Sequence, residues 1–206
     1  VNVINSIDLV LKENSVVGLV GPSGSGKSTL LNLIGLIESP TKGVIEIDNQ
    51  DITSLQDEKK TKMRKEKISF IFQNNQLLED FTCLENIALP LFFSGFSLIE
   101  SKKEALRLLN EYNLLNKKNY KPALLSGGEQ QRISVLRALI KKPRIILADE
   151  PTGSLDNLNS RIVMNNIVKL SKQLKTLTII ATHNLRFLPQ FDFTYEIAEG
   201  KLRKIK

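Results

Sequence analysis

Two hydrophobic patterns alternate along the chain. Short runs of β-branched and aliphatic residues, which are typical of buried strands, alternate with longer segments whose apolar positions recur at helical spacing. This ordering predicts an α/β fold with a mainly parallel sheet covered by helices. Strands are expected over residues 3–11, 16–20, 44–47, 68–72, 144–148, 177–181 and 193–198, and helices over 27–34, 57–65, 97–112, 128–140 and 157–172.

Residues 73–142 contain no strand pattern. We therefore expect a single domain spanning residues 1–206, with a sheet core over about 1–73 and 143–206 and an inserted helical subdomain over about 74–142. Ser97 and Glu100 have capping-box spacing, which marks a helix start inside this subdomain. The stretch IEIDNQDI is typical of a turn between two strands, so the early strands are expected to form a small antiparallel layer.

Composition narrows the class of protein. No apolar run approaches the roughly 18 to 20 residues of a membrane-spanning helix, and no secretory signal pattern opens the sequence, so a cytoplasmic location is expected. The single cysteine, Cys83, excludes an internal disulfide framework and is expected to be a small buried residue. The net charge of +7 comes from scattered lysines without interleaved aromatic residues. This arrangement favours a solvated surface over nucleic-acid binding.

The stretch VVGLVGPSGSGKST indicates a phosphate-binding loop. It combines a buried strand, a glycine-rich turn and a helix start, and residues 21–28 fit the pattern G-x-x-x-x-G-K-S. Glycines let backbone N–H groups surround phosphate oxygens, Lys27 adds a full positive charge, and Ser28 can bind Mg²⁺. The expected nucleotide-binding residues are Gly21, Pro22, Ser23, Gly24, Ser25, Gly26, Lys27, Ser28 and Thr29.

Polar side chains follow three other predicted strands. Asp149 and Glu150 end the stretch RIILADE, where Asp149 would hold Mg²⁺ and Glu150 would orient or deprotonate an attacking water. Gln73 follows ISFIF, and its amide oxygen could reach the metal or the water. His183, the only histidine, follows LTIIAT and could donate to the terminal phosphate. Because parallel strands end at one edge of a sheet, these residues are expected to meet there.

The stretch LSGGEQQR predicts a second anion site. Ser126, Gly127 and Gly128 open a helix in the helical subdomain and cannot easily reach the phosphate-binding loop of their own chain. The phosphate that they meet would then belong to another copy. This predicts a head-to-tail homodimer that encloses two ATP molecules and persists while ATP is intact.

Six motifs occur in the order found in ABC-transporter nucleotide-binding subunits, which the chain resembles across essentially its whole length. They are the phosphate-binding loop, Gln73, LSGGEQQR, RIILADE, the stretch SLD at residues 154–156, and His183. The resemblance implies a P-loop NTPase core, ATP and Mg²⁺ as cofactors, and integral membrane permease subunits as partners. It also implies that residues 154–156, with Asp156 near the nucleotide, communicate between the two ATP sites, and that Gln73 begins the loop that touches the permease.

The stretches FIFQNNQLLEDFTCLENIALPLFFSG and LADEPTGSLD resemble one group within this family. That group contains lipoprotein-releasing, macrolide-export and cell-division ATPases. The tripeptide DFT at residues 80–82 favours the lipoprotein-releasing branch. The implied location is the cytoplasmic face of the bacterial inner membrane, bound to two permease chains through a groove that includes Leu77, Leu78, Phe81 and Leu89. These four apolar residues could instead belong to the core.

Alternatives remain within and outside this group. Macrolide or peptide export and the control of cell division would use the same nucleotide chemistry. A nucleic-acid or ribosome-associated ATPase is disfavoured, because one cassette is present and only about fifty residues separate Gln73 from the second anion site. The family stacks adenine on an aromatic residue near its start, whereas no aromatic residue precedes Phe70 here. The stacking residue either precedes the given sequence or is replaced by weaker contacts.

Overall fold

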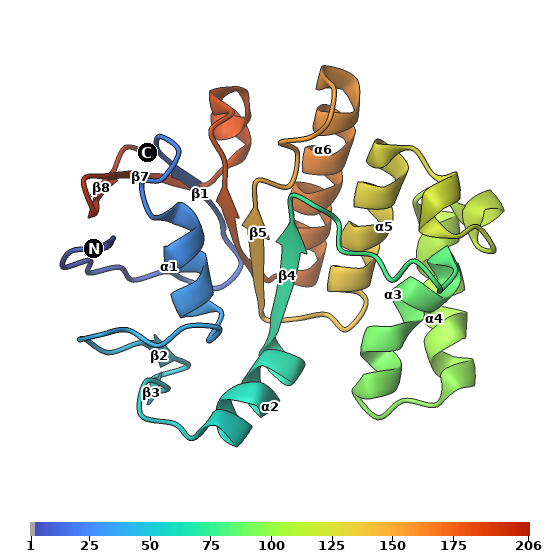
Figure 1. Ribbon diagram of the computed structural model, residues 1–206, viewed down its shortest axis with the longest axis horizontal. Helices are drawn as coiled ribbons and strands as arrows, with labels where there is room; N and C mark the ends of the chain where they lie inside the picture. Colours follow the sequence, from blue (N-terminus) through green and yellow to red (C-terminus); the bar gives the residue numbers. More distant parts are fainter. Residues whose placement is uncertain (1–2) are drawn as a thin grey trace.

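A six-stranded sheet runs through the centre of the computed structural model, which describes residues 3–206 (Figure 1). Five of its strands, β4, β5, β6, β1 and β7, run parallel to one another in that spatial order. The sixth, β8, pairs antiparallel with β7 at the edge. Across the sheet the strands are β4 (Ile68–Phe72), β5 (Ile145–Asp149), β6 (Leu177–Ala181), β1 (Val16–Val20), β7 (Phe193–Ala198) and β8 (Lys201–Lys204). The predicted α/β class with a mainly parallel sheet is confirmed.

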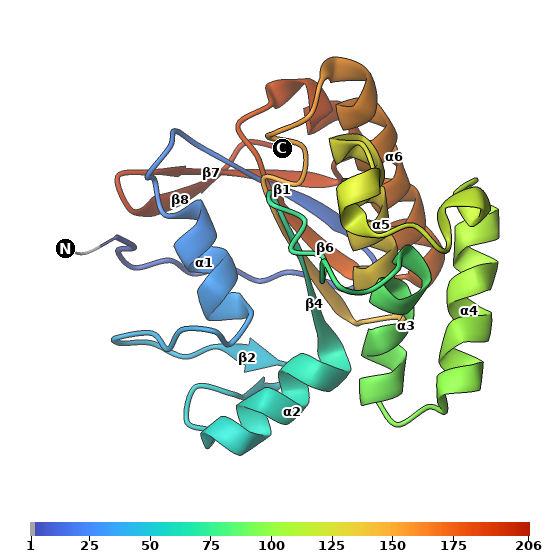
Figure 2. The same ribbon diagram turned by 45° about the vertical axis from the view of Figure 1, so that its right-hand side comes forward.

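Two apolar cores lie on opposite faces of this sheet. Ile146 and Ala148 point into one core, and Ile145 and Leu147 point into the other, because successive strand residues face opposite sides. The first core packs against α3 (Cys83–Phe93), α4 (Leu98–Glu111), α5 (Gly127–Leu139) and α6 (Asn157–Leu174). The second packs against α1 (Lys27–Ile34) and α2 (Asp57–Lys67). Figures 1 and 2 both show α1 on one side of the sheet and α5 and α6 on the other.

The helical block contains one helix that the sequence pattern did not reveal. α3 begins at a capping box formed by Thr82 and Glu85, but it contains Pro90 and is apolar on most sides, which hides its period. α4 begins at the predicted cap, Ser97, whose hydroxyl accepts a hydrogen bond from the Glu100 amide. Three 3₁₀ helices complete the connections, at Leu115–Lys117, Pro122–Leu124 and Leu185–Gln190. The subdomain limits near residues 74 and 142 remain a prediction.

The small antiparallel layer is present but short. β2 (Glu46–Ile47) pairs with β3 (Gln50–Asp51), and both turn residues between them, Asp48 and Asn49, have positive φ angles. Two successive left-handed residues are the requirement of the two-residue hairpin turn that matches strand twist. The predicted turn is confirmed, whereas the strand expected over residues 44–47 forms only at its second half.

The strand expected over residues 3–11 is wrong. No ladder forms there, and the Asn5 amide makes the only backbone hydrogen bond from residues 3–11 to the main sheet, to Gly200 O at 2.8 Å. Ser6 has a left-handed φ of 49°, which interrupts an extended backbone. Ile4, Ile7 and Leu11 still pack partly against the second core. The apolar pattern therefore reflects packing of an irregular segment, not strand pairing.

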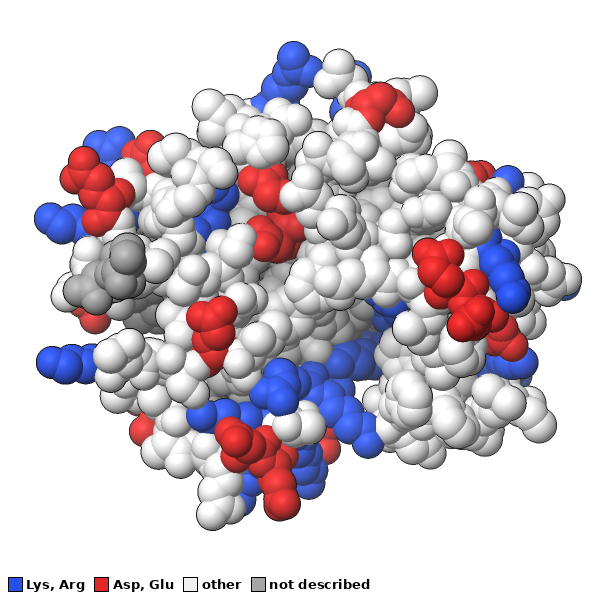
Figure 3. Space-filling view, in the orientation of Figure 1, with Lys and Arg blue, Asp and Glu red and all other residues white. Residues whose placement is uncertain are grey.

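Basic side chains are less evenly scattered than the sequence suggested. On the face drawn in Figure 3, Lys and Arg gather over α2 and in the hollow between α2 and α3. Within residues 3–206, no helix is both long enough and apolar enough to cross a membrane. Cys83 is buried and unpaired as expected, and burial raises the pKa of its thiol to about 11.

Candidate functional site

The glycine-rich loop joins the end of β1 to the start of α1. Gly21 has a φ of 150°, and a Cβ there would lie 2.3 Å from the carbonyl oxygen of Ile197, so only glycine fits. Gly26 has a φ of 103° and caps α1 without a side-chain hydrogen bond. The first N–H groups of α1 therefore have no side-chain acceptor, and the helix N-terminus presents a site for phosphate.

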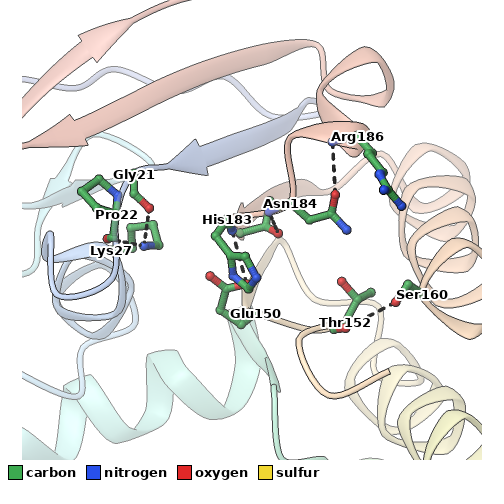
Figure 4. A network of polar contacts seen from close by, with 10 residues as sticks. Gly21, Pro22, Lys27, Glu150, Thr152, Ser160, His183, Asn184 and Arg186 are labelled. Atoms are coloured by element: carbon green, nitrogen blue, oxygen red, sulfur yellow. Dashed lines mark hydrogen bonds and ion pairs between the residues drawn. The ribbon is translucent and has the colours of Figure 1, made fainter. Parts of the chain in front are cut away.

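Lys27 is held across this loop. Its ammonium nitrogen donates to the carbonyl oxygens of Gly21 and Pro22, each at 2.9 Å, and the side chain is buried (Figure 4). These two contacts fix where the lysine charge lies at the loop. A positively charged group with three donors can keep a carbonyl contact and still bind a phosphate oxygen.

Asp149 ends β5 with one unsatisfied oxygen. Its Oδ1 is buried and has no hydrogen-bond partner, and a buried carboxylate oxygen without a donor is costly unless a cation neutralises it. No cluster of three or more His, Cys, Asp and Glu residues that could hold a metal occurs within residues 3–206. The donor set fits Mg²⁺, which is commonly held by one or two carboxylates together with substrate phosphates.

Glu150 and His183 form the polar pair of the site. His183 Nδ1 lies 3.0 Å from Glu150 Oε2, and the His183 amide donates to the same oxygen at 3.4 Å (Figure 4). Glu150 has a φ of 44°, and its amide donates to Ala181 O at the end of β6. A non-glycine residue in the left-handed region costs about 1 kcal/mol or more, and such strain often marks a functional position. Here it turns the carboxylate toward β6.

Gln73 emerges from the end of β4 and lies against Gly153. A Cβ at Gly153 would sit 2.9 Å from the Gln73 amide nitrogen, so glycine at this position leaves room for the amide. Gly153 was not singled out in the sequence, although a single glycine directly after DEPT is a visible signal.

These residues share one cleft of about 670 Å³. It is lined by Val3, Ser23, Gly24, Gly26, Lys27, Ser28, Thr29, Gln73, Asp149, Glu150 and His183. Residues that follow the carboxyl ends of β1, β4, β5 and β6 therefore meet in one cleft, as predicted. Val3 was expected in a strand and instead borders the cleft beside Gly26.

Ser126, Gly127 and Gly128 do not line this cleft. Ser126 caps α5, where its hydroxyl accepts from the Glu129 amide and Glu129 Oε2 accepts from the Ser126 amide. The hydrogen bond from the Ser126 amide to the carboxylate lowers the pKa of Glu129. Gly127 and Ser126 remain exposed at the helix N-terminus, so the predicted second anion site lies outside the chain's own cleft lining.

Asp156 also lies outside the cleft lining and caps α6. It accepts from the Asn159 amide at 2.9 Å and from the Asn159 side chain at 2.6 Å, and these contacts lower the pKa of Asp156. A Cβ at Gly128 would lie 2.5 Å from Asn159 Oδ1. Asn159 therefore joins Asp156 to the start of α5, a contact that the sequence motif did not reveal.

Comparisons with known proteins agree with this geometry. A family model described as ABC transporter matches residues 4–153. The chain is 40% identical over 202 residues to the "Lipoprotein-releasing system ATP-binding protein LolD" of Zymomonas mobilis, covering 98% of this chain and 87% of that protein. The protein of the same name from Wigglesworthia glossinidia brevipalpis is also 40% identical over 202 residues, with 98% and 88% covered.

Two similar solved structures are dimers. A dimeric ATP-binding cassette in a post-hydrolysis state, bound to ADP and Pi, superposes with a TM-score of 0.88 at 37% identity, covering 99% of this chain and 91% of that chain. A dimeric bacterial ABC transporter cassette superposes with a TM-score of 0.88 at 38% identity and the same coverage.

Proposed function

The chain belongs to the ABC transporter family of ATP-hydrolysing subunits, and on this premise we propose that a pair of these chains drives a permease that releases lipoproteins from the inner membrane. The proposal has three parts: a nucleotide site completed by a second copy, a hydrolytic group within each cleft, and a membrane partner. Each part rests on a different observation.

The proposed dimer rests on the location of the second anion site. Ser126 and Gly127 are exposed at the N-terminus of α5 and are absent from the cleft that contains Lys27. A helix N-terminus binds anions, and the phosphate available to it is the one held by a second chain. Two copies related by a two-fold axis would complete two such sites at once. Asp156 would lie at the same interface because it reaches α5 through Asn159.

Within the cleft, the described residues divide the work of hydrolysis. The loop amides and Lys27 hold the phosphates, and Ser28, Gln73 and Asp149 would hold Mg²⁺, which neutralises charge on the phosphate oxygens. Glu150 would accept a proton from the attacking water. His183, which lies beside Glu150, would donate to a terminal phosphate oxygen.

The surface near Gln73 supports a membrane partner. Leu78 and Phe81 are exposed by 45% and 39%, whereas Leu77 is buried and Leu89 is half-buried. The four residues expected in the permease groove therefore divide into two exposed residues, one core residue, Leu77, and the half-buried Leu89. Two permease chains would each insert a segment against this surface, with the ATPase on the cytoplasmic face as a peripheral subunit.

Lipoprotein release is the substrate class that the curated relatives support. The test is reconstitution of the chain with the two permease chains of a lipoprotein-releasing system in proteoliposomes that contain a triacylated lipoprotein. We expect ATP-dependent release by the unaltered chain and none by the Glu150→Gln variant. Stimulation of ATP hydrolysis by a macrolide-export permease, with no response to the lipoprotein-releasing chains, would assign the protein to the other branch.

A further inference from the structure

One face of α5 holds the backbone of the segment that follows β4. Three polar side chains at successive helical turns donate to carbonyl oxygens of residues 72–76, which we call the Gln segment. Gln131 donates to Phe72 O at 2.8 Å, and Ser134 donates to Asn75 O at 3.0 Å. Arg137 donates to Asn75 O at 2.8 Å and to Gln76 O at 2.6 Å.

Two of these three anchoring side chains are buried, and Arg137 is half-buried. Gln131 and Ser134 are 2% and 1% exposed, and the Arg137 guanidinium forms no salt bridge with any carboxylate within residues 3–206. Hydrogen bonds from a charged donor are stronger than neutral ones. Arg137 is therefore the strongest of the three anchors, and its position depends on these two carbonyl groups.

Beyond Phe72, the last residue of β4, the Gln segment has little structure of its own. Gln76 has a left-handed φ of 49°. Figure 1 shows the chain leaving β4 and crossing toward α3 beside α5. An irregular segment with no ladder takes its conformation from the groups that satisfy its carbonyls. α5 supplies those groups on both sides of Gln73.

We infer that Arg137 is a positioning residue for hydrolysis: by fixing Asn75 and Gln76 to α5, it sets where Gln73 presents its amide to the cleft. The inference rests on the proposed role of Gln73 beside Mg²⁺ and deepens it. Because α5 begins at Ser126, the helix that would meet the partner's nucleotide also holds Gln73. A shift of α5 would then displace Gln73.

A double-mutant cycle tests whether Arg137 acts through Gln73. Arg137→Met, Gln73→Ala and the double variant would be compared for the maximal rate of ATP hydrolysis and for the Mg²⁺ concentration that gives half of it. A misplacement of about 1 Å can cost up to about 100-fold in rate. We expect Arg137→Met to lower the rate roughly 10-fold and to raise the required Mg²⁺ concentration. In the Gln73→Ala background it should have almost no further effect.

Arg132 provides a matched control on the same helix. Its guanidinium also donates to a backbone carbonyl, that of Tyr112, which lies far from the Gln segment in the chain. Arg132→Met should combine additively with Gln73→Ala. Arg137→Lys, which keeps the charge with a single ammonium in place of the planar fork, should give a smaller loss in the same readouts. This variant also serves if Arg137→Met does not fold.

The outcomes separate the inference from the proposed function. If Gln73→Ala leaves both the rate and the Mg²⁺ requirement unchanged, the proposed role of Gln73 beside Mg²⁺ is contradicted, and the inference about Arg137 falls with it. If Gln73→Ala is defective but Arg137→Met or Arg137→Lys adds to it as fully as Arg132→Met does, Arg137 has only a structural role and the inference is overturned. ATP binding to the isolated subunit should be unchanged in the Arg137 variants, because the loop that carries Lys27 is not touched.

Discussion

His183 Nδ1 and Glu150 Oε2 lie 3.0 Å apart, with Glu150 mostly buried and His183 mostly exposed. The carboxylate is thus oriented by a residue from the end of the neighbouring strand, and the imidazole keeps its other nitrogen free for a ligand. This arrangement suits a general base whose direction is fixed before substrate arrives.

Glu150→Gln should retain ATP binding and lose hydrolysis by a factor of about 10² to 10⁴, the usual contribution of general base catalysis. Because the amide is similar in size to the carboxylate, two copies should still close around ATP and remain closed. Size-exclusion chromatography with ATP and Mg²⁺ should then show a dimer, and the nucleotide-free variant a monomer. Glu58→Gln, an exposed change in the first turn of α2, is the control. A strictly monomeric Glu150→Gln protein with ATP bound would contradict the shared site.

Ser126→Arg should prevent dimer formation while the isolated subunit still binds ATP. The replacement puts a large charged side chain at the N-terminus of α5, outside the cleft that holds the nucleotide. Part of any effect will come from losing the helix cap, which costs about 1 kcal/mol. Ser97→Arg removes the same kind of capping box from α4 and corrects for this cost. Loss of ATP-driven dimerisation in both variants would show that capping, and not phosphate contact, explains the result.

Strand ends were the most predictable part of the site. Asp149, Glu150, Gln73 and His183 all reach the cleft because parallel strands end at one edge, and each follows a run of buried apolar residues. Local chemistry also fixed the caps, since Ser97 and Glu100 bind as their spacing requires. Both results depend on interactions within a few residues or on the direction of a strand.

Contacts between distant segments were not predictable. Residues 3–11 have strand-like composition but find no ladder, and only packing against the finished sheet explains their apolar positions. α3 was missed because its buried faces make it almost uniformly apolar around Pro90. Arg137 likewise has no local partner, and its acceptors lie about sixty residues earlier in the chain. Sequence periodicity carries no information about such pairings.

Gly128→Ala should destabilise the fold by about 1–3 kcal/mol, the usual cost of overpacking. The new Cβ would lie 2.5 Å from Asn159 Oδ1, and Asn159 cannot move without breaking its hydrogen bond to Asp156. Urea unfolding measures the effect. Gly127→Ala is the matched control, because its Cβ would meet only Leu155 at 3.8 Å. Asn159→Ala in the Gly128→Ala background should recover part of the loss, whereas equal losses in both glycine variants would point to backbone effects.

Because of Lys141, the free energy of unfolding should change with pH in the alkaline range. Its ammonium group donates to the carbonyls of Arg64, Lys65 and Ile68 where α2 ends and β4 begins, and burial lowers its pKa from 10.5 to about 8. Between these two pH values the unfolded chain binds a proton that the folded chain has released. The free energy of unfolding therefore rises with pH in that interval, while below about pH 8 the full cost of burying the charge is present.

Lys141→Met isolates this contribution, because methionine has a similar shape and does not titrate. Urea unfolding at several values between pH 7.5 and 10.5 should show the unaltered protein gaining stability relative to the variant, by less than the roughly 3 kcal/mol of a fully buried group because solvent screens a partly exposed ammonium. Lys142→Met, at an exposed neighbouring position, should show no such trend. The three carbonyl acceptors favour the charged lysine and oppose the effect of burial. If the difference between the unaltered protein and Lys141→Met stays constant across this range, these hydrogen bonds outweigh desolvation and the charge is retained in the fold.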